Sequence, residues 1–197
     1  ILVGTQMVTK GHDFPYVTLV CVLDADAGLN FPDFRATERT IQLLTQVAGR
    51  SGRAQRPGRV LVQTWDPNHF GLQALKTHDY AQYCQEELQL RRTTGYPPYK
   101  FAATIRVDAR NPGHAERAMN VFGEELKAHR VEHPDLVVRG PAPAALERLK
   151  GRTRWAILLT APTRNELRSA LDSLSLEDPD RPKDIRVIVD VDPYDLL

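Results

Sequence analysis

The sequence predicts an α/β protein in two parts, a segment of parallel sheet followed by a split β-α-β-β-α-β domain of the ferredoxin-like type. Residues 1–3 and 17–23 are short apolar runs rich in β-branched side chains, typical of strands covered on both faces. Strand and helix patterns then alternate along the chain. Pro97-Pro98 interrupts the alternation and marks a candidate domain boundary.

The first part is predicted to contain one long helix between strands. Apolar residues recur at helical spacing in the segment from Phe34 to Ala48, and Gly49 is a typical stop. The turn-forming pair Pro57-Gly58 leads into a strand at 60–64. We therefore expect a sheet domain over residues 1–70.

A helical connector and a second domain are predicted to follow. Residues 71–95 carry a helical apolar pattern that ends before Gly95. The domain 96–197 should then hold two βαβ halves. Its expected strands are 101–107, 136–139, 154–160 and 185–191, and its expected helices are 114–131 and 164–174.

Composition is that of an ordinary globular protein. The 197 residues are 42% hydrophobic and 26% charged, with a formal net charge of +1, so a nucleic-acid partner must be met by a local patch. Cys21 and Cys84 encode neither a disulfide framework nor a zinc ligand set. No run of 18 apolar residues occurs, and Ile1 reads as the middle of a strand, so we expect a fragment of a longer chain.

Basic residues concentrate between Arg35 and Arg59, where six arginines face one acid, Glu38, for a local charge of +5. A motif begins with Gln46 at the end of the predicted helix. Arg50 and Arg53 lie three residues apart in the glycine-containing loop that follows. Two guanidiniums so placed could converge on a phosphoryl group as an arginine finger. A basic surface turn is the alternative interpretation.

The loop from Gly4 to Phe14 follows a predicted strand, the place where α/β sheets bind ligands. Gly11 could bring backbone close to a phosphate, and Asp13 could accept a hydrogen bond from a ribose hydroxyl. Thr5 and Lys10 could contact a nucleic-acid backbone. A capped loop without function is the alternative.

A second basic cluster contains Arg148, Lys150, Arg152 and Arg154 and runs into Trp155. Alternating cations beside an aromatic suit a phosphate backbone with a base stacked at its end. The alternative is a solvated hairpin face with the tryptophan in the core.

For three other groups of residues, a structural role is favoured over a functional one. Asp24 and Asp26 could hold a metal but lack a third ligand, which favours loop caps or salt bridges. Tyr96 and Tyr99 could stack on bases, although packing of the domain junction is favoured. Met119 is expected to pack in the core.

The motifs together resemble those of superfamily 2 helicases, and within them the PriA family of replication-restart helicases. The segment 4–15 resembles motif V and the segment 46–53 resembles motif VI. The similarity extends along the whole chain through Leu23-Asp24-Ala25-Asp26, Phe34-Arg35, Glu38-Arg39, Gln63-Thr64, Gly140-Pro141-Ala142-Pro143, Arg154-Trp155 and Asp190-Val191-Asp192-Pro193.

The resemblance implies the C-terminal half of a RecA-like helicase lobe 2, followed by the family's C-terminal domain, in an ATP-driven 3′ to 5′ DNA helicase. Its catalytic group would be Arg53 as the finger, with Arg50 and Gln46. The resemblance also implies that Gly11 and Asp13 complete the nucleotide side, and that Thr5, Gln6 and Lys10 couple the ATP state to DNA. Arg164, with Arg168 one turn on, would grip the acidic C-terminal tail of single-stranded DNA-binding protein.

Further partners implied are forked and single-stranded DNA, primosome proteins and the replicative helicase loader, in a cytoplasmic, nucleoid-associated bacterial protein without a membrane partner. ATP, Mg²⁺ and zinc would belong to the full-length protein. Neither a Gly-x-x-x-x-Gly-Lys-Ser/Thr loop nor an Asp-Glu-x-His motif occurs in this chain. We therefore expect the chain alone to be inactive. A docking module with a degenerate ATP site is the alternative.

Overall fold

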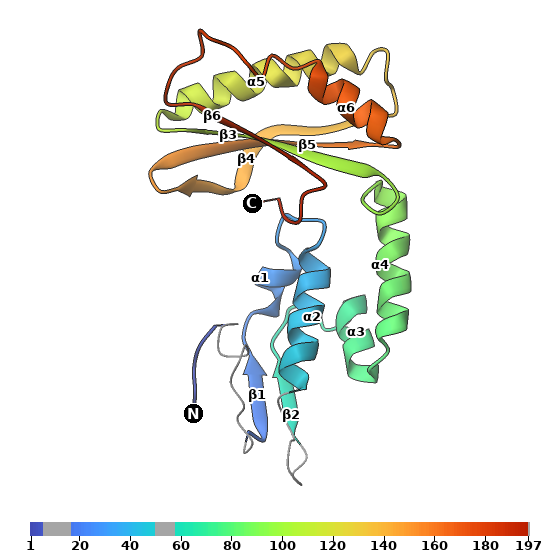
Figure 1. Cartoon of the computed structure of the whole chain (residues 1–197). Coiled ribbons are helices and arrows are strands. Elements are labelled where there is room, and N and C mark those ends of the chain that lie inside the picture. The colour runs from blue at the N-terminus through green and yellow to red at the C-terminus, as the bar shows by residue number, and fades with distance from the viewer. Residues whose placement is uncertain (6–16, 50–57, 197) are drawn as a thin grey trace. The chain divides into compact units, whose positions relative to one another are not determined.

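The computed structural model describes residues 1–5, 17–49 and 58–196, which divide into two compact units, 1–89 and 90–197 (Figure 1). The division falls inside a helix, somewhat before the predicted domain start at residue 96. Each unit has its own core of buried apolar side chains.

The first unit is built on a parallel pair of strands, β1 (Leu19–Val22) and β2 (Arg59–Val62), with Leu19 opposite Arg59. Its helices are α1 (Ala25–Leu29), α2 (Ala36–Ala48), α3 (Phe70–Thr77) and α4 (Tyr80–Thr94), whose last residues belong to the second unit. Val22 and Val62 pack against a core that contains Ile41, Leu44 and Tyr83. The parallel pair and long helix expected from sequence are therefore present.

Two predicted elements of this unit differ from the structure. Residues 1–3 are exposed and form no strand, since the only ladder within the described part of this unit joins β1 to β2. The helix expected over 71–95 is broken, because His78 adopts a left-handed conformation with φ of 56°. Asp79 accepts a hydrogen bond from the Gln82 backbone N–H at 2.8 Å and so starts α4 afresh.

The second unit has the element order expected from sequence. Its elements are β3 (Phe101–Ala109), α5 (Pro112–His129), β4 (Val137–Leu149), β5 (Arg152–Ala161), α6 (Arg164–Asp172) and β6 (Arg186–Val191). The antiparallel sheet has the strand order β4-β5-β3-β6. Figure 1 shows α5 and α6 on one face of this sheet.

The core of the second unit follows from strand alternation. Ile105 and Val107 of β3 point to the helices and are fully buried against Phe122 and Met119 of α5. Trp155 is partly buried and packs against the same cluster, which favours the core interpretation of this residue. Burial of each such side chain stabilises the fold by about 1.5–3 kcal/mol.

Helix starts are fixed by side-chain caps. The Asn111 side chain accepts a hydrogen bond from the Gly113 N–H at 3.0 Å, and Pro112 occupies the first turn of α5. The Thr163 hydroxyl accepts from the Glu166 N–H at 3.2 Å at the start of α6. Within the described residues, no helix is both long and apolar enough to cross a membrane.

Strand β4 is irregular, with register shifts between Arg139 and Ala142 and between Pro143 and Arg148. Gly140 lies in the first shift with φ of 106°, and a Cβ there would lie 2.7 Å from the Ala156 carbonyl oxygen. Glycine is required at this position both by its backbone conformation and by the close approach of β5.

We expect Gly140→Ala to lower the free energy of unfolding by about 2 kcal/mol or more, since strain at positive φ adds to the contact with Ala156. Urea unfolding of the chain measures this. Gly151→Ala is the matched control: Gly151 has φ of 73° but open space at its Cβ position, so its loss should be the smaller one. Equal losses would contradict the role of the close approach.

Candidate functional site

Most residues of the two helicase-like motifs lie outside the described part of the chain. These are Gln6, Lys10, Gly11, Asp13, Arg50 and Arg53. Thr5 is described and exposed, and Gln46 is exposed on the last turn of α2, which ends at the C-cap Gly49. Of the three residues predicted to form the catalytic group, Gln46 is the one within the described part of the chain.

The two aspartates after β1 accept hydrogen bonds that hold the local backbone in place. Asp24 accepts a hydrogen bond from the Ala27 N–H at 3.3 Å and so caps α1. Asp26 accepts from the Thr64 hydroxyl and from the Trp65 N–H, each at 2.9 Å, which joins the ends of β1 and β2. The hydrogen bond from Trp65 holds the pKa of Asp26 below its ordinary value. No cluster of three metal-ligating side chains occurs among the described residues.

An arginine at the start of α2 is held by a buried acid that the sequence pattern did not single out. The Asp33 carboxylate, whose side chain is fully buried, lies 2.9 Å from Nη1 of Arg39. It also accepts from the Arg35 N–H at 2.9 Å. The Phe34-Arg35 segment is thereby fixed at the helix entrance, and an Asp before an Arg-rich helix start is a signal that could have identified this contact.

The four cations of the β4–β5 hairpin divide into two pairs. Arg148 and Lys150 are exposed, whereas Arg152 is half-buried and Arg154 is only 4% exposed. Nε of Arg154 lies 3.5 Å from the Asp108 carboxylate, and Nε of Arg106 lies 3.2 Å from the same carboxylate. Of the predicted DNA-binding cations in this hairpin, the structure thus leaves two at the surface and commits two to internal contacts.

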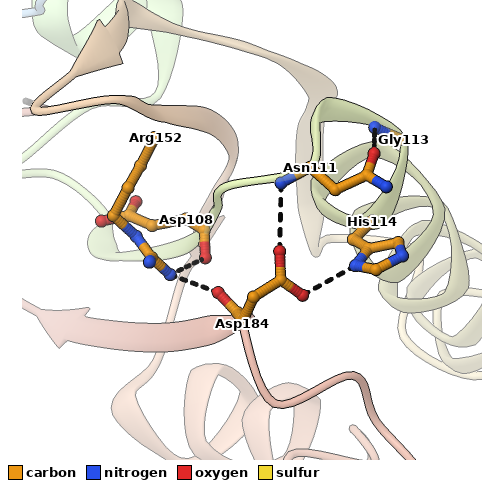
Figure 2. Close-up of polar contacts among 6 residues, drawn as sticks. All are labelled: Asp108, Asn111, Gly113, His114, Arg152 and Asp184. Atoms are coloured by element: carbon orange, nitrogen blue, oxygen red, sulfur yellow. Dashed lines mark hydrogen bonds and ion pairs between the residues drawn. The ribbon is translucent and has the colours of Figure 1, made fainter.

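Arg152 belongs to a polar cluster that joins distant parts of the second unit (Figure 2). Its Nη2 donates to the Asp108 carbonyl at 2.8 Å and to the Asp184 carbonyl. The Asp184 carboxylate accepts from the Asn111 N–H at 3.0 Å and faces Nδ1 of His114 at 2.7 Å. One arginine and one aspartate therefore link β3, β5, α5 and the segment that enters β6.

The two arginines predicted to bind an acidic peptide both lie exposed on α6. Arg164 is the first residue of the helix, its guanidinium lies 5.1 Å from the centre of the Phe101 ring, and its Nη2 lies 3.7 Å from Asp192. Arg168 lies 3.6 Å from Asp172. Both ion pairs are solvent-exposed and therefore weak, so the guanidiniums are available to another carboxylate.

Tyr96 is half-buried and packs within the second unit. Arg139 stacks over its ring at 4.7 Å and donates to the Thr94 carbonyl at 2.8 Å. Tyr99 is 44% exposed, with the Arg92 guanidinium 5.9 Å from its ring centre. The contact of Arg139 with Thr94 and Tyr96 ties the end of α4 to β4.

Comparison with known proteins defines the class first. A family described as the primosomal protein N C-terminal domain matches residues 92–194, which covers most of the second unit. Among curated proteins, the replication restart protein PriA of Haemophilus influenzae is 41% identical over 196 residues, and that of Bacillus subtilis is 41% identical over 203. The PriA of Synechocystis is 39% identical over 199 residues.

The chain belongs to the PriA family. Each of these alignments covers 100% of this chain but only 27%, 24% and 23% of the respective relative, so the chain spans about a quarter of their length. The resemblance inferred from the motifs is thereby confirmed at the level of the family.

Acid should weaken the second unit through Asp184. Its hydrogen bonds, first that from the Asn111 N–H and then that from His114, lower its pKa from 3.8 to about 2. The ionised carboxylate therefore stabilises the fold above its unfolded pKa, and this contribution is lost as the pH falls through 3.8 towards 2. We expect Asp184→Asn to reduce stability at neutral pH and to flatten the acid limb of a plot of urea midpoint against pH.

The control for this prediction is Asp180→Asn, which removes the same charge from an exposed position nearby in sequence. It should leave the steepness of the acid limb unchanged. An Asp184→Asn variant with the same acid limb as the unaltered chain would contradict the assignment.

Proposed function

We propose that this chain is the C-terminal part of a replication-restart DNA helicase and serves two tasks in the longer protein, completion of an ATP site and retention of DNA. The observation that carries the proposal is the similarity to replication restart proteins over the full chain, motif segments included. These relatives are named for replication restart, which supports the same role for the longer protein.

The first unit would supply the residues that respond to the bound nucleotide. Arg53 is assigned as the arginine finger that stabilises charge on the γ-phosphate, with Arg50 and Gln46 beside it. The parallel pair of β1 and β2 supports assignment of this unit to a RecA-like lobe, since parallel strands are characteristic of such sheets. Gly11 and Asp13 would line the nucleotide, while ATP phosphates and Mg²⁺ would be held by residues outside this chain.

Coupling of ATP hydrolysis to DNA is assigned to Thr5, Gln6 and Lys10. Together with Gly11 and Asp13, these residues lie within nine positions of one another in the same predicted loop, so a change at the nucleotide would be transmitted along a short stretch of sequence to the DNA contacts. Closure on ATP and opening after hydrolysis would then alter the hold on DNA.

The second unit would bind DNA and an acidic peptide. The strand order β4-β5-β3-β6 supports its assignment as ferredoxin-like, because it interleaves two βαβ halves. Its exposed hairpin cations, Arg148 and Lys150, suit a phosphate backbone. On the α6 side, Arg164, whose guanidinium lies over the Phe101 ring, and the exposed Arg168 suit the acidic C-terminal tail of single-stranded DNA-binding protein. Primosome proteins and the helicase loader would be further partners of the longer protein.

In the full-length protein, Arg53→Ala should lower kcat for ATP hydrolysis by about 10³-fold or more with little loss of DNA affinity, because only transition-state charge is left unneutralised. A DNA-stimulated ATPase assay measures this.

Arg56→Ala is the matched control, since it removes the same charge three residues away and outside the motif. It should retain near-normal turnover. Near-normal turnover of Arg53→Ala would contradict the finger and favour a docking module with a degenerate ATP site.

We expect the 197-residue chain to bind DNA weakly and to lose binding as salt rises. Replacement of Arg148 and Lys150 together by Gln should lower affinity and reduce the log–log salt slope by about 2, one for each lost phosphate contact. Fluorescence anisotropy of a labelled duplex at several salt concentrations measures both.

The control replaces Lys127 and Arg130, two exposed cations at the end of α5, by Gln. This variant has the same net charge but should keep the original salt slope. Equal slope changes in the two variants would show that overall charge, rather than the hairpin, binds DNA.

A further inference from the structure

The hairpin between β4 and β5 ends in a tight turn that carries both apolar and cationic side chains. Lys150 and Gly151 have φ of 49° and 73°, and Leu149 pairs directly with Arg152, as in a two-residue hairpin turn. We call residues 146–151 the hairpin tip.

The hairpin tip exposes two leucines. Leu146 is 41% exposed and Leu149 is 43% exposed. Arg148 and Lys150 are exposed beside them, and Glu147 is the only acid in the tip's sequence. Apolar side chains flanked by cations at the end of a hairpin match a partner that offers an apolar surface bordered by negative charge.

The root of the hairpin is fastened on several sides. The Leu146 carbonyl accepts a long hydrogen bond from the buried guanidinium of Arg154 at 3.4 Å, and Arg154 also faces Asp108. The Arg152 side chain joins β5 to the carbonyls of Asp108 and Asp184 (Figure 2). The tip is therefore held in place by its own domain before any partner binds, which lowers the entropic cost of contact.

The charge around the root is also positive. Exposed Arg110 directly follows β3, and exposed Arg186 opens β6 opposite Asp108. Beside the exposed Glu147 of the tip, Asp108 is engaged by Arg106 and Arg154, and Asp184 by His114 and the Asn111 N–H. This end of the sheet therefore offers net positive charge to a phosphate backbone on either side of the tip.

We propose that the hairpin tip is a wedge for a DNA branch point, in which Leu146 and Leu149 pack against the end base pair of a duplex while Arg148 and Lys150 hold the phosphates of the diverging strands. The inference rests on the proposed DNA-binding function and deepens it. In a continuous duplex the base faces are covered by stacking, whereas a branch point uncovers one. The leucines thus select branched DNA, and the cations bind either form.

The test compares a forked duplex with a continuous duplex of the same length, each with 2-aminopurine at the position of the branch. The unaltered 197-residue chain should bind the fork more tightly and change 2-aminopurine fluorescence in the fork only. Leu146→Ser with Leu149→Ser should lower fork affinity about fivefold and continuous-duplex affinity by less than about twofold. Leu149→Phe should keep the preference, because it retains an apolar side chain.

The control is Val121→Ser with Val131→Ser, which replaces two exposed valines on and after α5 and should keep the fork preference. A leucine variant that keeps the preference, or an unaltered chain that binds both duplexes equally, overturns the wedge and leaves the DNA-binding function standing. A chain that binds neither DNA at low salt contradicts DNA binding by the second unit itself. Circular dichroism confirms that each variant is folded.

Discussion

Arg152 is the residue on which the organisation of the second unit's basic end depends. Its guanidinium bonds two backbone carbonyls from segments distant in sequence, at residues 108 and 184. A charged donor makes such bonds stronger than those between neutral groups. The same two segments are tied again through side chains, because Asp108 faces Arg154 and Asp184 faces the start of α5. The hairpin, the end of β3 and the entrance to β6 therefore form one cross-linked body.

This arrangement separates cations that the sequence presents as one cluster. The turn at Lys150 and Gly151 divides them, so that Arg148 and Lys150 lie at the free end and Arg152 and Arg154 lie over the sheet. Arg152 is held in internal contacts by the backbone carbonyls of Asp108 and Asp184, which lie 44 and 32 residues away in the sequence. Neighbouring residues in the sequence do not indicate those distant partners, so all four cations were predicted to bind DNA.

Where sequence prediction succeeded, the signal was local. The alternation of buried residues in β3 and the helical spacing in α5 are set by neighbouring residues, and both elements lie within two residues of their predicted bounds, with Met119 in the core. The short helix α1 was missed because its start depends on a left-handed Asp24, and the break at His78 was missed for the same kind of reason. For the motif residues Arg50 and Arg53, the family is confirmed, whereas their roles stay a prediction.

The basic cluster contains two kinds of cation, those that support the fold and those exposed to a ligand. Mutagenesis must test the two kinds separately. Removal of Arg154 leaves the Asp108 carboxylate, whose side chain is 15% exposed, with one cation fewer, and the cost of a poorly compensated charge there exceeds that of a lost surface contact. Removal of Lys150 changes only what the surface offers to a ligand. If the hairpin binds DNA as proposed, a variant in which all four cations were replaced would therefore lose affinity through loss of structure as well as through loss of contacts. In this hairpin, the proposed phosphate contacts and the side chains that support them come from residues only two to six positions apart, and burial is the property that separates them.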